Sequence, residues 1–389
     1  MSTPRPLLST SLVLLTAVFA LTSCQTPAGP TSRAANEFFV FYGVSDQGAG
    51  VGISLGRFNS TTGRLTTPAL ATEAAGPSFF TLSADGRFLY ACHEPAGEVA
   101  AYTLDRATGA LRLLNKLPSG GADPCHISLD RTGRFALVAN YTGGSVAVFS
   151  IRPDGSLGER TAFDQHHGSG PHPNQQSAHS HAMLTDPTNR FALCADLGTD
   201  KIYIYRFDEK TGALTPNDPA FGVLAPGSGP RHLVFSQDGK IVYVTNELNA
   251  TVTALRWDGA RGALTEFQTI GNLPAGLSAA GTSNAEIALH PNGKFLYTSN
   301  RGQDRITVFA IDPASARLAS VQDVSTRGQK PRFFGFDPTG QWLLANNQTS
   351  GTVALFKVDA TNGQLTPTGD LLAAPHPDCM VFLPLPPAR

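Results

Sequence analysis

Short blocks of apolar residues, separated by polar turn residues, recur along the chain in a fixed order. One kind of block is PSFFTLSADG from Pro77, and PRHLVFSQDG from Pro230 is a later copy. Most copies end in an Asp-Gly, Thr-Gly, Thr-Asn or Asn-Gly pair and continue into a second apolar block, such as RFLYACHE or KIVYVTNE. Such pairs are typical of tight turns, so each pair of blocks predicts a β-hairpin.

The hairpin is part of a larger repeat. A third apolar block follows each hairpin, as in EVAAYTL or KIYIYRF, and a turn such as ATGAL then leads to a shorter fourth block. The whole unit spans roughly 50 residues, a length that fits the four antiparallel strands of a propeller blade and no helical repeat. The first block has seven copies, which begin at Pro77, Pro124, Ser180, Pro230, Ala285, Pro331 and Pro377.

The two ends of the repeat array complete each other. The N-terminal side supplies FFVFYGV from Phe38 and VGISLGRF from Val51, which are a second and a third block without a first. The C-terminal side supplies PDCMVFLP from Pro377, a first block without a second. A blade shared between the chain ends closes the ring, so the sequence predicts an all-β, seven-bladed propeller over residues 37–389.

Charged and polar residues stand where first blocks begin and second blocks end. Because the two strands are antiparallel, both positions reach the same rim of the disc, at one mouth of the central channel. Several blades therefore bring acids, bases and arginines together, as expected of a binding site. The candidates are His179, His181, Arg231 and His232 at the beginnings, and Asp196, Asn246, Glu247, Asn300 and Arg301 at the ends.

Each candidate also has a structural interpretation. Asparagine ends the second block at positions 140, 246, 300 and 347, and a repeated Asn is simplest as a hydrogen-bonding device of the blade. Arg301 and Glu247 also fit an ion pair at the channel rim. Function is favoured for these two because the same position holds Tyr141 or Leu197 in other blades, so no structural rule of the repeat requires charge there.

Half of the histidines lie in HHGSGPHPNQQSAHSH, from His166 to His181. A His-rich loop can bind metal, but no carboxylate or Cys completes a recognisable ligand spacing. We therefore expect His166, His167 and His172 to be loop residues over the mouth, and we expect no metal and no cofactor.

The N-terminal residues resemble an export signal. The apolar run LVLLTAVFAL at 12–21 is short for a membrane span but suits a signal peptide. Leu21-Thr22-Ser23-Cys24 resembles the lipobox of bacterial lipoproteins, in which the cysteine becomes lipidated. We predict a signal at 1–24, a tether at 25–36 and a protein exported and anchored by lipid on Cys24, facing the periplasm or the cell exterior. A simple secreted protein or an uncleaved anchor is the alternative.

The overall composition limits the classes of partner that are expected. Formal net charge is −1 with 15% charged residues and no basic cluster, so neither nucleic acid nor an anionic membrane surface is indicated. Membrane contact is expected only through the lipid anchor. The remaining cysteines lie inside apolar blocks without CxxC spacing, which favours buried free thiols and leaves disulfide pairing open; they are Cys92, Cys125, Cys194 and Cys379.

Three segments resemble the propeller-type lactonase family, which includes bacterial 6-phosphogluconolactonase and fungal carboxymuconate lactonising enzyme. They are HSHAMLTDPTNRFALCADLGTDKIYIY, GPRHLVFSQDGKIVYVTNEL and AEIALHPNGKFLYTSNRG. The resemblance covers nearly the whole chain after the tether. It implies an active site of His179 or His181, with His181 favoured, together with Arg231, Glu247 and Arg301. His232, Asn246, Asn300 and Asp196 are expected to bind substrate.

The resemblance implies hydrolysis of a lactone. Glu247 or His181 would act as general base toward water, while Arg231 and Arg301 would hold an anionic group and stabilise the oxyanion. The substrate is expected to be a sugar lactone, with or without a phosphate group, although the export signal fits an extracytoplasmic sugar lactone better. Two alternatives remain: a non-enzymatic binding propeller, since YVTN at 243–246 also resembles repeats of surface-layer proteins, and a cycloisomerase related to the muconate enzymes.

Overall fold

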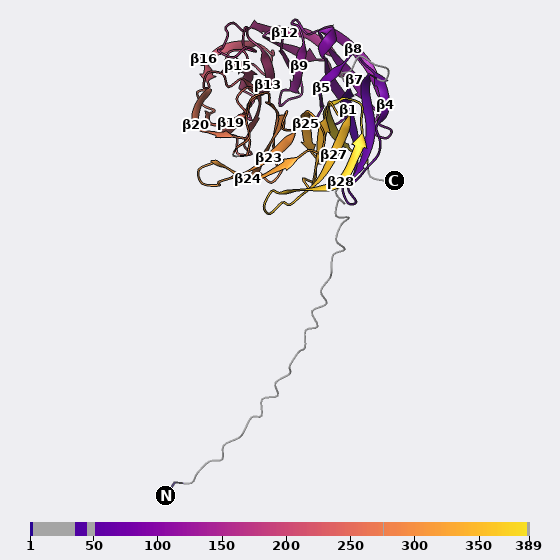
Figure 1. Ribbon diagram of the computed structural model, residues 1–389, viewed down its shortest axis with the longest axis vertical. Coiled ribbons are helices and arrows are strands. Elements are labelled where there is room, and N and C mark those ends of the chain that lie inside the picture. Colours follow the sequence, from indigo (N-terminus) through magenta and orange to yellow (C-terminus); the bar gives the residue numbers. More distant parts are fainter. Residues whose placement is uncertain (3–35, 45–50, 275, 387–389) are drawn as a thin grey trace. The chain divides into compact units, whose positions relative to one another are not determined.

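The computed structural model describes residues 1–2, 36–44, 51–274 and 276–386, and the predicted signal, Cys24 and most of the tether lie outside this part. Residues 35–389 form one compact unit. Its strands make seven antiparallel sheets arranged as blades around a ring, which confirms the predicted propeller (Figure 1). No helix in the described ranges is long and apolar enough to cross a membrane.

The strands of a blade are called first to fourth here, after the four apolar blocks of the repeat, and the first strands lie innermost. The first strands are β5 (Pro77–Leu82), β9 (Pro124–Leu129), β13 (Ser180–Thr185), β17 (Pro230–Phe235), β21 (Ser283–Leu289), β25 (Pro331–Phe336) and β29 (Pro377–Pro384). The second strands are β6 (Phe88–His93), β10 (Phe135–Asn140), β14 (Phe191–Asp196), β18 (Ile241–Asn246), β22 (Phe295–Arg301), β26 (Trp342–Asn347) and β1 (Glu37–Val44).

The outer half of each blade consists of the remaining strands. The third strands are β7 (Glu98–Leu104), β11 (Ser145–Ile151), β15 (Lys201–Phe207), β19 (Thr251–Asp258), β23 (Arg305–Ile311), β27 (Thr352–Val358) and β2 (Gly52–Asn59). The fourth strands are β8 (Leu111–Pro118), β12 (Leu157–Gln165), β16 (Leu214–Val223), β20 (Ala263–Gly271), β24 (Leu318–Ser325) and β28 (Leu365–Ala373), with β3 (Arg64–Leu65) and β4 (Ala69–Glu73) on β2. A short 3₁₀ turn, η1, covers Glu94–Ala96.

The chain ends share a blade as predicted. β1 pairs with β2 on one side and with β29 on the other, and the β29 register runs from Phe38 opposite Pro384 to Val44 opposite Pro377. The β1 sequence is apolar at nearly every position and buried along its length except at Glu37, as suits a strand that is covered on both faces. The junction of the two termini therefore has the same construction as the six blades made from continuous chain.

The hydrophobic core lies between the blades. One cluster joins Tyr243 and Val252 of one blade to Leu296 and Phe309 of the next, and all four side chains are essentially inaccessible to solvent. Side chains at successive positions point to opposite faces of a strand, and the second strands are apolar and buried at nearly every position, so both faces of each sheet are packed against neighbouring blades. Cys92, Cys194 and Cys379 belong to these layers, and these three cysteines and Cys125 are buried free thiols.

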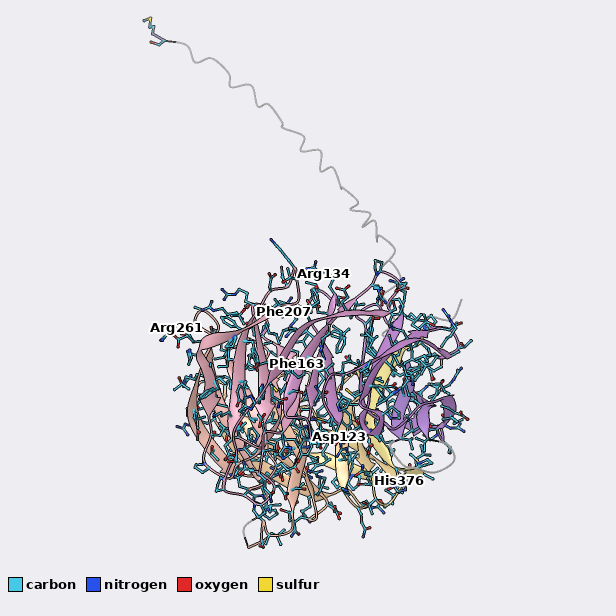
Figure 2. The ribbon with its side chains drawn as sticks, turned by 90° about the horizontal axis from the view of Figure 1, so that it is seen from above. Asp123, Arg134, Phe163, Phe207, Arg261 and His376 are labelled. Carbon is cyan, nitrogen blue, oxygen red and sulfur yellow. The ribbon has the colours of Figure 1, made fainter. Side chains whose placement is uncertain are left out.

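The disc has two distinct rims. Figure 2 shows Asp123 and His376, which precede first strands, toward one side, and Arg134 and Arg261, which lie in turns between strands, toward the other. Second strands run back to the side on which first strands begin. The predicted site residues therefore belong to the rim of Asp123 and His376, and the hairpin turns form the opposite rim.

Candidate active site

Every first strand carries a β-bulge close to its beginning. In all seven described sheets the register between the first and second strand shifts by one residue at this point. A bulge re-aims a side chain, and bulges are frequent beside active sites. The added residues are Ser78, Cys125, His181, Arg231, Arg332 and Asp378, and in β21 the extra residue falls within Ala285–Glu286. Five of these and Glu286 line one narrow cavity, so the bulges direct polar groups into the channel.

Two arginines share one carboxylate at the channel wall. Arg231 Nε and Arg301 Nη2 each lie 2.9 Å from the same oxygen of Glu247, Oε2. Arg231 Nη1 also donates to the Ala285 carbonyl at 2.8 Å, and Arg301 Nη2 donates to the Asn284 carbonyl at 3.0 Å. The arginine side chains are 2% and 11% exposed, and that of Glu247 is 15% exposed. One carboxylate cannot neutralise two guanidinium groups, so the trio keeps a positive charge.

The positive charge governs the protonation of this trio. Burial alone would raise the pKa of Glu247, but Arg301 and Arg231 outweigh burial and lower that pKa. Burial and the neighbouring Arg301 lower the pKa of Arg231 to about 10, which still leaves the guanidinium charged at neutral pH. A fixed pair of cations with little water around them is suited to stabilising negative charge that develops on a bound substrate.

The two histidines of the HSH segment have different surroundings. His181 is buried at its bulge position, and its ring contacts that of His232 with centroids 5.1 Å apart. His179 lies further out, stacked on Tyr141 at 4.6 Å, and its Nδ1–H donates to the Tyr141 carbonyl at 3.0 Å. Burial and then Arg231 hold the pKa of His181 well below 6.5, so its ring is neutral at pH 7. The geometry favours His181 over His179 as the channel residue.

His232 connects the group formed by Arg231, Glu247 and Arg301 to a second glutamate. Its Nδ1 lies 3.0 Å from Glu286 Oε1, and its Nε2 lies 3.3 Å from Arg231 Nη1. Burial, and then Arg231, lower the pKa of His232 well below 6.5, so the ring is neutral. The neutral ring then donates from Nδ1 to the carboxylate and accepts at Nε2 from the guanidinium. Burial raises the pKa of Glu286 to about 7, with Arg231 opposing the shift.

Comparison with known proteins identifies the family of the chain. The model of the family described as "Lactonase, 7-bladed beta-propeller" matches residues 39–382. The 6-phosphogluconolactonase of Bacillus subtilis is 35% identical over 349 residues, which are 89% of this chain and 99% of that protein. The periplasmic gluconolactonase of Pseudomonas aeruginosa is a structural neighbour with a TM-score of 0.86 and 33% identity, covering 90% of this chain and 100% of that one.

The chain belongs to the seven-bladed β-propeller lactonase family. A 6-phosphogluconolactonase of Formosa agariphila, 33% identical over 75% of this chain and 84% of that protein, is a further relative. The four residues that the resemblance implied, His181, Arg231, Glu247 and Arg301, come from three neighbouring blades and lie together on one side of the channel.

Three predicted substrate-binding residues are instead bonded within the protein. Asn246 Nδ2 donates to Thr251 Oγ1 at 2.8 Å, and Asn300 Nδ2 donates to Asn284 Oδ1 at 3.0 Å. Asp196 accepts the His179 N–H and the Thr199 N–H through Oδ1. All three side chains are at most 1% exposed. Burial and these bonds favour a structural role over the predicted contact with substrate, whereas His232 keeps its place in the channel.

His166 lies in a loop directly after β12, as predicted, but it is buried inside the protein. Its Nδ1 lies 2.7 Å from Asp196 Oδ2, and its Nε2 lies 2.6 Å from the Tyr205 hydroxyl. The ring therefore fixes the His-rich segment to the neighbouring strands, while His167 is exposed and His172 is half-buried. Across the described part of the chain, no group of three or more His, Cys, Asp or Glu side chains has an arrangement that could hold a metal ion.

Sequence reasoning missed Glu286, Arg332 and Asp378. Arg332 lies between two carboxylates, 3.6 Å from Glu94 and 3.9 Å from Asp378. A signal was present, because Arg332 follows Pro331 as Arg231 follows Pro230, and Asp378 follows Pro377. Aligning the residue after the first proline of each repeat identifies most of the bulge residues. Glu286 is harder to find, since its strand has no such proline.

Proposed function

We propose that this protein hydrolyses a sugar lactone, opening the ring with water to give the hydroxy acid. The observation that carries the proposal is the pair of buried arginines on one carboxylate, Arg231 and Arg301 on Glu247, at a channel mouth in a lactonase-family propeller. Ester hydrolysis creates a negative charge on the carbonyl oxygen, and preorganised cationic donors are the groups that stabilise it. Relatives named 6-phosphogluconolactonase and gluconolactonase support the reaction class.

The geometry of Arg231, Glu247 and Arg301 supports a distinct role for each of them. Arg231 and Arg301 supply N–H donors to the lactone carbonyl as it becomes an oxyanion, and Glu247 holds both guanidinium groups in position. Because Arg301 and Arg231 lower the pKa of Glu247, this carboxylate is a weak base. His181 remains the proposed partner of the leaving ring oxygen, since it is neutral and lies beside His232.

For the substrate, we propose an unphosphorylated sugar lactone met outside the cytoplasm. Two features support it: the signal-like run at 12–21 with its Cys24, and the likeness over 90% of the chain to a protein named a periplasmic gluconolactonase.

Lipidation of Cys24 would hold the enzyme on a membrane. Cell fractionation checks this address, because Cys24→Ser is expected to move the protein from the membrane fraction to the soluble fraction; an unchanged distribution contradicts the anchor.

The decisive experiment compares hydrolysis of gluconolactone and of 6-phosphogluconolactone, each corrected for the spontaneous rate. We expect kcat/KM to be higher for gluconolactone and to fall about 100-fold in Arg301→Gln, because one oxyanion donor is lost. Arg261→Gln is the matched control, since Arg261 is exposed and lies toward the opposite rim (Figure 2). Wild-type rates equal to the spontaneous rate for both lactones would contradict a hydrolase and favour a binding propeller.

A further inference from the structure

A small polar cavity lies in the channel beside Arg231, which belongs to the group with Glu247 and Arg301. Its volume is about 10 Å³, close to the least that can hold one water molecule. Side chains from six blades line it, including Arg231 and Glu286 on one side and Ser78 and Arg332 on others. The cavity is therefore too small for a sugar but large enough for the water that a hydrolase needs.

Glu286 lines this cavity, and one of its two carboxylate oxygens has no hydrogen-bond partner in the protein. Oε1 is occupied, because the His232 ring nitrogen Nδ1 lies 3.0 Å away and the Ile287 N–H donates to it at 3.0 Å. Oε2 is buried without a hydrogen-bond partner in the protein, although the residue is only 7% exposed. The Ser78 hydroxyl, from another blade, lines the same cavity and is likewise buried without a protein partner. An unsatisfied carboxylate oxygen is costly to bury and marks a functional group.

The other acid–base groups of the site are less suited to removing a proton from water. Both arginines bind Glu247 Oε2, and they lower the pKa of that carboxyl. The His181 and His232 rings have pKa values held well below 6.5, chiefly by burial. A general base works best when its pKa is near the working pH. Among these groups, Glu286 alone combines a raised pKa, about 7, with a carboxylate oxygen that has no hydrogen-bond partner in the protein and a place in the lining of the cavity.

We propose that Glu286 is the general base of the reaction and that the cavity beneath Arg231 is the site of the attacking water. This inference rests on the proposed lactone hydrolysis. Oε2 takes one proton from water as the water oxygen bonds to the lactone carbonyl carbon, and the oxyanion forms beside Arg231 and Arg301. When the carbon–oxygen ring bond breaks, the proton passes from Glu286 to the ring oxygen beside His181, and the ring oxygen becomes a hydroxyl group. The products are one hydroxy acid and the regenerated Glu286 carboxylate.

His232 is a positioning residue in this scheme. Its Nδ1–H fixes Oε1, which leaves Oε2 as the unpartnered oxygen of the carboxylate, and its Nε2 lies 3.3 Å from Arg231 Nη1. The base and the oxyanion donor are thereby held in one hydrogen-bonded chain across β17 and β21. This arrangement places proton removal and charge stabilisation on the same side of the channel.

The pH dependence follows from the charged groups around Glu286. Burial raises its pKa, and Arg231 and His126 are among the groups that lower it in part. The base must be ionised, so kcat/KM is expected to rise with pH up to about 7 and to level off above it. The titratable and charged groups that surround it are Arg231 and His232 of β17, Cys125 and His126 of β9, His181 of β13, Arg301 of β22, Arg332 of β25, Asp378 of β29, and Glu247 after β18.

Glu286→Gln tests the proposal. The amide keeps the size of the side chain and can still accept from His232, but it cannot take a proton from water. At pH 8 we expect kcat for the preferred lactone to fall by about 10²–10⁴-fold with KM within about threefold, and the residual rate to lose its rise toward pH 7. Glu98→Gln is the matched control, because Glu98 pairs with Lys116 on an outer strand, and it should leave kcat and the pH profile unchanged.

Glu286→Asp keeps the test open if the glutamine variant does not fold. It retains a carboxylate but withdraws it by one methylene, so we expect a smaller loss of kcat and a persisting rise with pH. An active wild type, an impaired Arg301→Gln and a Glu286→Gln with wild-type kcat and pH profile would overturn this inference alone. A Glu286→Asp with wild-type kcat would do the same. A wild type that does not exceed the spontaneous rate would instead contradict the proposed function itself.

Discussion

Two buried glutamates beside Arg231 differ in their protonation. Glu247 lies 2.9 Å from a nitrogen of each arginine, and the pair overcomes the effect of burial and lowers the pKa of Glu247. Glu286 contacts a neutral His232, and burial raises the pKa of Glu286 to about 7. The same residue type thus becomes a permanent anion in one position and a proton acceptor in the other.

At the residue scale, Glu247→Gln should reduce both stability and activity. Two largely buried guanidinium groups lose their shared counter-ion, so the free energy of unfolding at pH 7 is expected to fall by about 2–4 kcal/mol. Misplaced arginines should lower kcat about 100-fold. Urea denaturation and lactone hydrolysis provide the measurements. Unchanged stability would show that solvent compensates the positive charge of the two arginines.

The stability loss has a definite pH dependence. Because the pKa of Glu247 is lowered in the folded protein, its carboxylate stabilises the fold above the ordinary glutamate pKa of 4.5, and this contribution is lost as the pH falls through the lowered pKa. The difference in free energy of unfolding between wild type and Glu247→Gln should therefore be full at neutral pH and shrink under acidic conditions. A difference that grows with acidification would contradict this assignment.

At the scale of the elements, each blade separates the turns that stabilise it from the rim that carries chemistry. In the hairpin between β13 and β14, Asp186 Oδ1 accepts the N–H groups of Arg190 and Phe191 at 2.9 and 3.0 Å. Asp130 does the same for Arg134 and Phe135 in the preceding blade. These turns lie on the rim opposite the site, the side on which Figure 2 shows Arg134.

Asp186→Ala should therefore destabilise the protein without affecting catalysis. The substitution leaves two backbone N–H groups without their acceptor, which is expected to cost about 1–3 kcal/mol in free energy of unfolding. Denaturation in urea measures the loss, and kcat/KM for the preferred lactone should stay within about twofold of wild type. A large fall in kcat/KM in the folded variant would show that the two rims are coupled.

The asparagine that ends several second strands forms a hydrogen bond within its blade. Asn140, Asn246 and Asn347 each donate through Nδ2 to the Ser or Thr five residues later, at 2.8 to 3.3 Å. The bond ties the end of the second strand to the beginning of the third. Repetition of Asn in the sequence indicates such a device, whereas Arg301 and Glu247, which break the repeat at the next position, lie in the candidate site.

At the scale of the whole molecule, ring closure depends on the pairing of the two chain ends. β29 covers β1 along its length and also contributes Asp378 to the channel cavity. Without β29, the edge of β1 would be unpaired and the core cluster that includes Phe41, Phe80 and Leu383 would open to solvent.

A chain that ends at residue 375 should therefore fail to form a stable monomer. We expect aggregation or loss of the cooperative thermal transition, because an unpaired strand edge and apolar surface become exposed. A chain that ends at residue 386 keeps all described strands and is the control, expected to melt like the wild type. Circular dichroism and size-exclusion chromatography make the comparison. A monomeric, cooperative and active protein ending at 375 would show that closure is dispensable.

The sequence by itself determined the strands, their order, the number of blades, the shared blade and the rim on which the site lies. These follow from local apolar alternation, turn residues and repetition, all of which are readable along the chain. Only the tertiary structure decided which side chains meet. The bulge in each first strand selects the residue that enters the channel, and the ring places Glu286 beside Arg231 and His232. Burial at that junction raises one glutamate pKa and leaves the other lowered by arginines, and neither effect exists before residues distant in sequence are packed together.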